Sequence, residues 1–168
     1  SANIALRELN AYNNNLTALD ISQQTDLTHL IIKNNSLSIL DISQNTALTN
    51  LQVHNNNLTS LDASDNPQLE RVLVNNNNLE SLNVRNGNTQ NILIFNAAGN
   101  PNLSCINVDD ENAVYLNGIF WTKNGAASYN EFCPEYYTYV PDDNFEQALI
   151  TLGHDDVLDD YVLTTGIN

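Results

Sequence analysis

Hydrophobic residues recur with a step of 21 residues through the first hundred positions. One repeat begins LTHLIIKNNSL at 27–37. The alternation predicts a short strand whose residues Leu30 and Ile32 point into a core. Strands of successive repeats then stack in parallel, because one repeat cannot bury its apolar edge alone. The recurring columns are Leu9, Leu30, Leu51, Val72 and Leu93; Leu16, Leu37, Leu58 and Leu79; and Leu19, Leu40, Leu61 and Leu82.

Asparagine fills one position of each repeat just after the predicted strand. A buried amide there can pair backbone groups that a tight bend leaves without partners. In the fifth repeat Ala98 replaces this asparagine. The column consists of Asn14, Asn35, Asn56 and Asn77.

The second half of each repeat has the same pattern, for example LSILDISQN at 37–45. We therefore expect both sides of each coil to be extended, with little or no helix in the array. Further along, Leu103, Ile106 and Val108 fit the pattern only if about three residues are inserted.

This pattern is the leucine-rich-repeat consensus, and the chain resembles the 21-residue repeats of secreted multidomain Bacteroidetes proteins, similar in style to internalins. LTSLDASDN at 58–66 is typical of that group, and NPNLSC at 100–105 begins a stretch that resembles its C-terminal cap. YVPDDNFEQAL at 139–149 resembles the helical segment before a further array. The resemblance implies a leucine-rich-repeat solenoid of about five coils, mainly β with parallel strands. It implies an array at 1–104, a cap at 105–133 and an acidic, helix-containing tail at 134–168.

A cap must cover the apolar cross-section of the last coil. In a secreted protein Cys105 and Cys133, which bracket the implied cap, would form a disulfide worth about 3–4 kcal/mol, and two free thiols are the alternative. Two cysteines without further ligands do not make a zinc site. The hydrophobic residues available for the cap are Val114, Leu116, Ile119, Phe120 and Trp121.

Both ends of the chain depart from the regular repeat. Pro141 predicts a helix start and Gly153 its end. The chain begins in the middle of a repeat, at Leu6 and Leu9, so we expect it to be a fragment of a longer multidomain protein. An open first coil would also allow association with a second copy of the chain.

Charge narrows the classes of partner. The formal net charge is −15, from 20 acidic residues against five lysines and arginines. Phosphate binding needs a basic surface, so nucleic acid is excluded as a partner. No apolar run reaches the length of a membrane span, which argues against membrane insertion.

The outward residues of the predicted strands line the concave side of such a solenoid, and we call this surface the strand face. It holds two of the five lysines and arginines, two of the three histidines and one acidic residue, Glu8. A neutral to slightly basic face on an acidic protein can focus the field toward an anionic or neutral partner. Its columns are Glu8, His29, Asn50, Arg71 and Ile92; Asn10, Ile31, Gln52, Leu73 and Ile94; and Tyr12, Lys33, His54, Asn75 and Asn96.

We predict that the strand face binds a protein or a polysaccharide. Tyr12 would stack on the ligand, Lys33 and Arg71 would bind anionic groups, and the aliphatic residues would contact protein. The alternative is that exposed positions of repeats vary freely and these side chains lie here by chance. The candidate residues are Tyr12, His29, Ile31, Lys33, Gln52, His54, Arg71 and Leu73.

Metal chemistry has little support in the sequence. His29 and His54 lie on adjacent strands but four rows apart, more than ~10 Å, so one metal cannot reach both. The column Asp20, Asp41 and Asp62 is expected to be a solvated ladder or to cap local turns, and the alternative is weak divalent-cation binding along it. The acidic tail is the other candidate place for weak calcium binding. We expect no other cofactor.

No catalytic motif is present: the chain has no G-x-S-x-G elbow, zinc-protease helix or phosphate loop. We therefore predict a non-catalytic recognition module of a secreted or cell-surface multidomain bacterial protein. The alternative is a structural spacer within a multidomain adhesin or polysaccharide-degrading enzyme.

Overall fold

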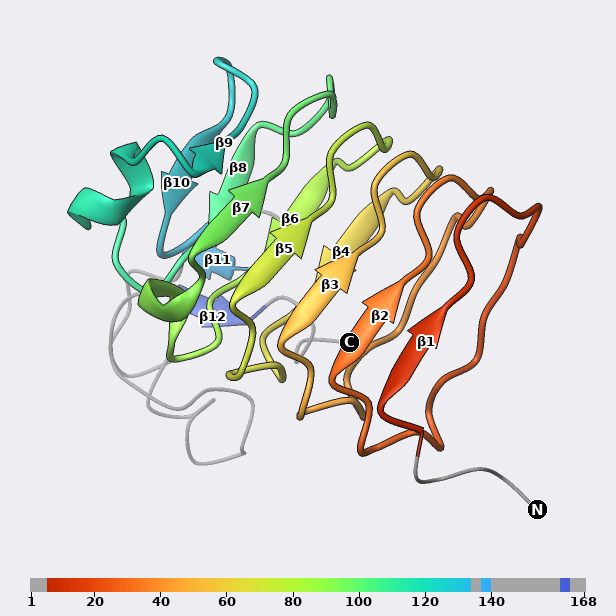
Figure 1. The fold of residues 1–168 in the computed structure, drawn as a ribbon. Helices are drawn as coiled ribbons and strands as arrows, with labels where there is room; N and C mark the ends of the chain where they lie inside the picture. Colours follow the sequence, from red (N-terminus) through yellow and green to blue (C-terminus); the bar gives the residue numbers. More distant parts are fainter. Residues whose placement is uncertain (1–5, 134–136, 140–160, 164–168) are drawn as a thin grey trace. The chain divides into compact units, whose positions relative to one another are not determined.

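The computed structural model describes residues 6–133 and the backbone of 137–139 and 161–163. The chain divides into two compact units, Ser1–Glu131 and Phe132–Asn168. In the first unit successive coils each add a strand to a parallel sheet (Figure 1). In the second, β11 (Tyr137–Tyr139) pairs antiparallel with β12 (Tyr161–Leu163). The helix predicted from Pro141 lies outside the described residues.

The first sheet contains the strands predicted from the repeat. Its strand order is β1-β2-β3-β5-β7-β9, and all neighbours are parallel. Leu30 lies opposite Leu51, so the 21-residue step of the sequence is the register of these strands. The strands are β1 (Glu8–Asn10), β2 (His29–Ile31), β3 (Asn50–Gln52), β5 (Arg71–Leu73), β7 (Ile94–Asn96) and β9 (Trp121–Thr122).

A second parallel sheet runs along the other side of the coils, in the order β10-β8-β6-β4. It begins at Ser60, and the equivalent positions of the first two coils are in no strand. Leu82 pairs with Ile106, which confirms the three inserted residues. The strands are β4 (Ser60–Asp62), β6 (Ser81–Asn83), β8 (Cys105–Asn107) and β10 (Ser128–Asn130).

The expectation of little helix in the array is confirmed. Within the described residues the helical segments are two short 3-10 turns, η1 (Thr89–Asn91) and η2 (Val114–Asn117). The core lies between the two sheets, where aliphatic side chains such as Leu51 and Leu82 are fully buried. Each coil therefore shares its apolar edge with the coils on either side.

A ladder of asparagines, buried from Asn56 onward, joins consecutive coils. Asn56 Oδ1 accepts a hydrogen bond from the Leu37 N–H at 3.0 Å, and its Nδ2 donates to the carbonyls of Ile32 and Val53. Asn35 and Asn77 repeat this arrangement in their own coils. The amide column predicted from the sequence thus satisfies backbone groups at the inward bend.

The ladder continues through the fifth coil. The 21-residue step placed Ala98 at the ladder position of this coil, but the structure places Asn100 there. Asn100 is fully buried, accepts from the Leu79 N–H at 3.1 Å and donates to the carbonyls of Val74 and Ala97. The fifth turn contains two extra residues, so the amide stands two positions later in the sequence.

A second asparagine column lies on the surface, one residue before each asparagine of the column predicted from the sequence. Asn13, Asn34, Asn55 and Asn76 all have φ near +56°, which asparagine tolerates better than most residues. Their amides form a chain, for example from Asn55 Nδ2 to Asn34 Oδ1 at 2.6 Å. The next coil has Gly99 instead, at φ +72°, and a Cβ there would lie 2.1 Å from Asn76 Oδ1.

The fifth strand differs in register from the sequence prediction. Phe95, and not Leu93, lies opposite Val72, and Ile94 lies opposite Arg71. The chain accommodates the two extra residues in the segment that leads into η1, where the Asp109 carboxylate accepts hydrogen bonds from the N–H groups of Gly87 and Thr89. Ile92 therefore lies in the core, and Leu93 is 65% exposed.

Residues 105–131 extend both sheets by another coil, through β9 and β10. Leu116 and Trp121 are buried, as expected for residues that cover the apolar end. Val114, Ile119 and Phe120 are 88%, 88% and 61% exposed, so their predicted role in covering the core was wrong. Cys105 and Cys133 form the predicted disulfide.

Candidate functional site

The outer face of the six-stranded sheet brings the candidate residues together. His29, Arg71 and Leu73 are outward residues of their strands and are half-buried between neighbours. Ile31 and Gln52 are paired across β2 and β3. Tyr12, Lys33 and His54 follow the ends of their strands by two residues and form a further column. The strand face is therefore one surface.

The fifth member of each predicted column changes with the corrected register. Ile92 leaves the strand face, and Ile94 and Asn96 each move one column, to lie beside Arg71 and Leu73. Trp121 pairs with Phe95, so Phe120, the residue before β9, follows Ile94 in the column that contains Arg71. The strand face is consequently more apolar at this end than the 21-residue step predicts.

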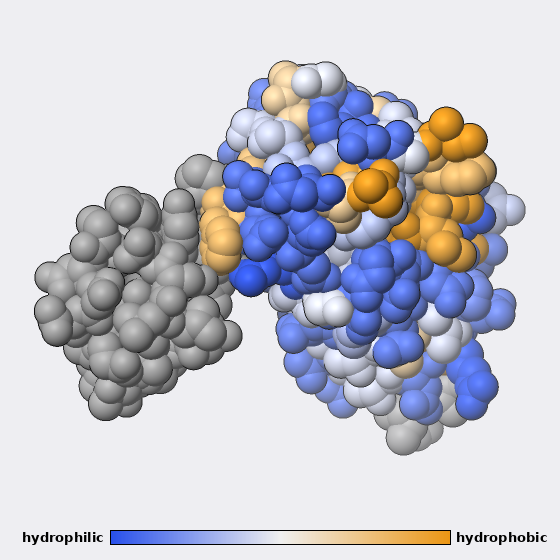
Figure 2. Space-filling view, turned by 90° about the vertical axis from the view of Figure 1, so that its left-hand side faces the viewer, coloured by the Kyte–Doolittle hydropathy of each residue, from blue (hydrophilic) through white to orange (hydrophobic). Residues whose placement is uncertain are grey.

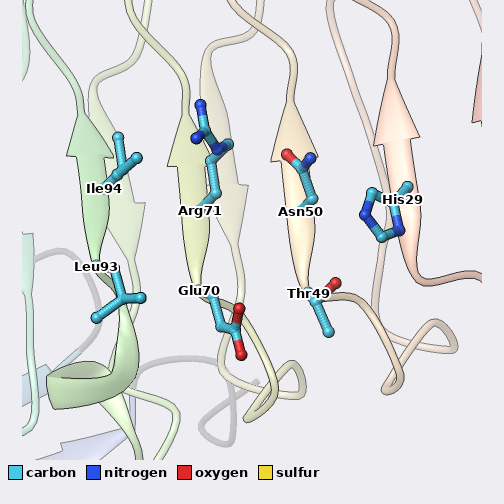
Figure 3. Close-up of a pocket in the computed structure, with 7 residues that line it drawn as sticks. All are labelled: His29, Thr49, Asn50, Glu70, Arg71, Leu93 and Ile94. Carbon is cyan, nitrogen blue, oxygen red and sulfur yellow. The ribbon is translucent and has the colours of Figure 1, made fainter.

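A shallow pocket of about 170 Å³ lies across four adjacent strands of this face. Figure 3 shows its seven residues in two rows, with Glu70 and Arg71 pointing in opposite directions. One row, at the start of the strands, contains Thr49, Glu70 and Leu93. The second row is His29, Asn50, Arg71 and Ile94.

Arg71 is the main cation of this pocket. Within the described residues its guanidinium makes no hydrogen bond or ion pair, although Glu70 is its sequence neighbour. A guanidinium offers five donors in a planar fork that fits carboxylates. The pocket thus places a half-buried cation beside amide, hydroxyl and imidazole groups, with aliphatic side chains at one end.

Exposed apolar residues continue from the pocket toward the last coil. Leu93 lines the pocket and is 65% exposed, and Phe120 is 61% exposed. Figure 2 views the molecule from the end that carries β9 and β10, and shows hydrophobic residues gathered along one side. An exposed cluster of this kind beside an arginine is the composition of a protein-contact surface.

A second group on the strand face contains Tyr12, Lys33 and His54. Lys33 Nζ lies 5.4 Å from the centre of the Tyr12 ring, a cation–π contact. Partial burial, and then the positive charge of Lys33, lower the pKa of His54 below its ordinary value. The imidazole is therefore neutral at pH 7, and Tyr12 is already in contact with a cation of its own chain.

Sequence reasoning missed Thr49, Glu70, Leu93 and Phe120 as members of the site. Thr49 and Glu70 stand one residue before their strands, a row that the predicted columns did not include. The signal that could have found Leu93 is the polar stretch RNGNTQN at 85–91, which is two residues too long for the repeat.

The aspartate column on the other side of the coils has a structural role. The Asp20, Asp41 and Asp62 side chains accept hydrogen bonds from the backbone N–H two residues later, at 2.9–3.0 Å. These bonds lower the pKa values of Asp20 and Asp41. They cap local turns, one of the roles that the sequence left open.

The described part of the chain contains neither a metal-binding cluster nor a membrane-spanning helix. There, no three His, Cys, Asp or Glu side chains gather as a metal ion would require. Among those same residues, no helix has the length and apolar character to cross a membrane.

Comparison with known proteins supports the fold. No family model matches the chain, and no curated protein matches it. The chain is similar to a solved structure, the functional domain of InlJ from Listeria monocytogenes, which includes a cysteine ladder. The two share 23% identity with a TM-score of 0.52, over 79% of this chain and 28% of that one. The described array is thus a leucine-rich-repeat solenoid of internalin-like fold.

Proposed function

We propose that this chain is a protein-recognition module that binds its partner across the strand face, with Arg71 at the centre. The observation that carries the proposal is the pocket in which the Arg71 guanidinium, which has no hydrogen-bond or ion-pair partner among the described residues, lies beside Ile94, with exposed Leu93 in the neighbouring row. Arginine and large apolar side chains in adjoining pockets are typical of the residues that dominate binding energy in protein interfaces. The proposal involves no catalysis.

The partner has a definite chemistry under this proposal. It offers a carboxylate to Arg71 and an apolar side chain to the surface of Leu93, Ile94 and Phe120. A bidentate pair between a carboxylate and a guanidinium would fix the register of the partner on the sheet. Glu70 and Glu8 on the same surface select against a partner that is acidic throughout.

The disulfide and the likeness to the Listeria structure bear on where the protein acts and on what surrounds this module. A disulfide is typical of proteins outside the cytoplasm, so we propose a secreted or cell-surface protein. The chain spans 28% of the length of the Listeria structure that it matches. We propose that it is one module of a longer bacterial protein, with the Bacteroidetes origin implied by the repeats.

The test begins with site-directed photo-crosslinking. A crosslinking amino acid is placed at Asn50, in the pocket, or at Ser60, in β4 of the other sheet, and any captured protein is identified and purified. We expect capture from Asn50 alone. The Kd of the purified partner should then rise about tenfold or more for Arg71→Ala and for Leu93→Asp.

The matched control is Arg85→Ala, which removes the same charge after β6 on the other sheet. Its Kd should stay within about twofold of the wild type. Equal capture from Ser60, or an unchanged Kd for Arg71→Ala, would refute the proposal. If no protein is captured and a polysaccharide binds to the strand face, the glycan alternative is favoured. If neither a protein nor a polysaccharide binds, the spacer alternative is favoured.

A further inference from the structure

A second cavity, separate from the Arg71 pocket, lies at the last coil of the array. Its volume is about 480 Å³, within the usual range of small-molecule sites. We call it the cap cavity. The lining side chains that matter here are Glu111, Asn117, Trp121, Thr122, Lys123 and Tyr129.

The aromatic part of the wall is held rigidly. Trp121 Nε1 donates to the Ile92 carbonyl at 2.9 Å, and the indole stacks on Phe95 with ring centres 4.4 Å apart. Tyr129 meets the indole edge-on at 5.8 Å. Because these rings are fixed by the core, the apolar part of the cavity is formed before any ligand arrives.

The polar part of the wall has unused hydrogen-bonding groups. Within the described residues the side chains of Asn117 and Thr122 make no hydrogen bond, and the Tyr129 hydroxyl is buried without a partner. Burial raises the pKa of Tyr129 to about 12, so this hydroxyl stays protonated and can donate. Glu111 accepts one long bond, at 3.4 Å, from the Glu131 N–H. Donors and acceptors are therefore both available.

Charge decides the class of ligand. Glu111 and Lys123 contribute one negative and one positive charge, so the wall is close to neutral. The positive charge of Lys123 opposes an organic cation, because its Nζ lies 5.2 Å from the centre of the Tyr129 ring and donates to the Ala127 carbonyl. The net charge of −15 opposes an anionic ligand. A neutral ligand with many hydroxyl groups remains.

We propose that the cap cavity binds a neutral carbohydrate, one or two sugar rings in size. The apolar face of a sugar ring packs against those edges of Trp121 and Tyr129 that line the cavity, and its hydroxyls pair with Asn117, Thr122 and Glu111. This binding is independent of the protein partner proposed for the strand face, since the two sites have no residue in common.

Trp121 is the single tryptophan of the chain, so tryptophan emission from the folded protein comes from the wall of the cap cavity. The full chain is titrated with neutral disaccharides (cellobiose, maltose, chitobiose, mannobiose), with a uronic acid disaccharide and with choline. We expect a saturable change in Trp121 emission with at least one neutral sugar below about 10 mM, and none with the charged probes.

Variants locate the effect. Asn117→Ala and Thr122→Ala should each weaken sugar binding about fivefold or more, because each removes a hydrogen bond to the ligand. Arg71→Ala, on the strand face, should leave it unchanged, so failure of this proposal is distinguishable from failure of the first. Absence of a response to every neutral sugar, a stronger response to a charged probe, or equal affinity in the cavity variants would overturn the proposal.

Discussion

Replacement of Asn56 by alanine tests whether the buried amide ladder holds the array together. Asn56 is 7% exposed and makes three hydrogen bonds to backbone groups of two coils. The Leu37 N–H has no other partner in this ladder, whereas the carbonyls of Ile32 and Val53 keep bonds from Asn35 and Asn77. The substitution therefore leaves one buried donor without a partner and removes two bonds whose acceptors remain satisfied.

The magnitude follows from this inventory. A buried N–H without a partner costs about 1–3 kcal/mol, and each lost bond to a satisfied acceptor contributes about 0.5 kcal/mol. We expect the free energy of unfolding to fall by about 2–4 kcal/mol. Urea unfolding, followed by Trp121 fluorescence and by far-UV circular dichroism, measures this change.

Asn55→Gly is the matched control, since it removes an exposed amide one position away. Asn55 has φ +56°, which glycine adopts without strain, and its amide bonds only to Asn34 and Asn76 on the surface. Its cost should stay below about 1 kcal/mol. If Asn56→Ala costs no more than Asn55→Gly, a water or a backbone shift satisfies Leu37 and the ladder argument is wrong.

Three further predictions use the same unfolding assay. Gly99→Ala should lower the free energy of unfolding by about 2 kcal/mol or more, because the added Cβ meets Asn76 Oδ1 at 2.1 Å. Gly87→Ala, at a similar φ but with open space around it, should lower it by about 1 kcal/mol, and equal losses would contradict the steric argument. Cys133→Ser should lower stability by about 3–4 kcal/mol relative to the oxidised protein and by little relative to the reduced protein. The hydrogen bond from the Ser43 N–H lowers the pKa of Asp41 below 3.8, so the Asp41 carboxylate stabilises the fold above that pH and loses this effect as the pH falls below it. Asp41→Asn keeps an acceptor, as Asn83 does, and should therefore lose less stability on acidification than the wild type; an unchanged loss would contradict this assignment.

Repetition made the fold predictable from sequence. Each column of leucines and asparagines appears in at least four repeats, so an error at one position could not mislead the assignment. The strand register of Leu30 with Leu51, the low helix content and the outward positions of His29, Lys33 and Arg71 all follow from a period of 21 residues. The disulfide was implied by resemblance, because spacing alone does not pair cysteines.

Tertiary structure decided what happens where the period fails. The two extra residues of the fifth coil could have been placed at several points, and the Asp109 carboxylate, which binds the N–H groups of Gly87 and Thr89, places them in the segment that leads into η1. That placement buries Ile92, turns Leu93 outward into the pocket that contains Arg71, and moves the ladder amide from position 98 to Asn100. The cap cavity likewise depends on the packing of Trp121 between Phe95 and Tyr129, contacts between residues that the repeat does not relate. Periodicity thus determined the regular coils, which supply Arg71 and most of its pocket, and long-range contacts determined the irregular ones, which supply the apolar end of that pocket and the cap cavity.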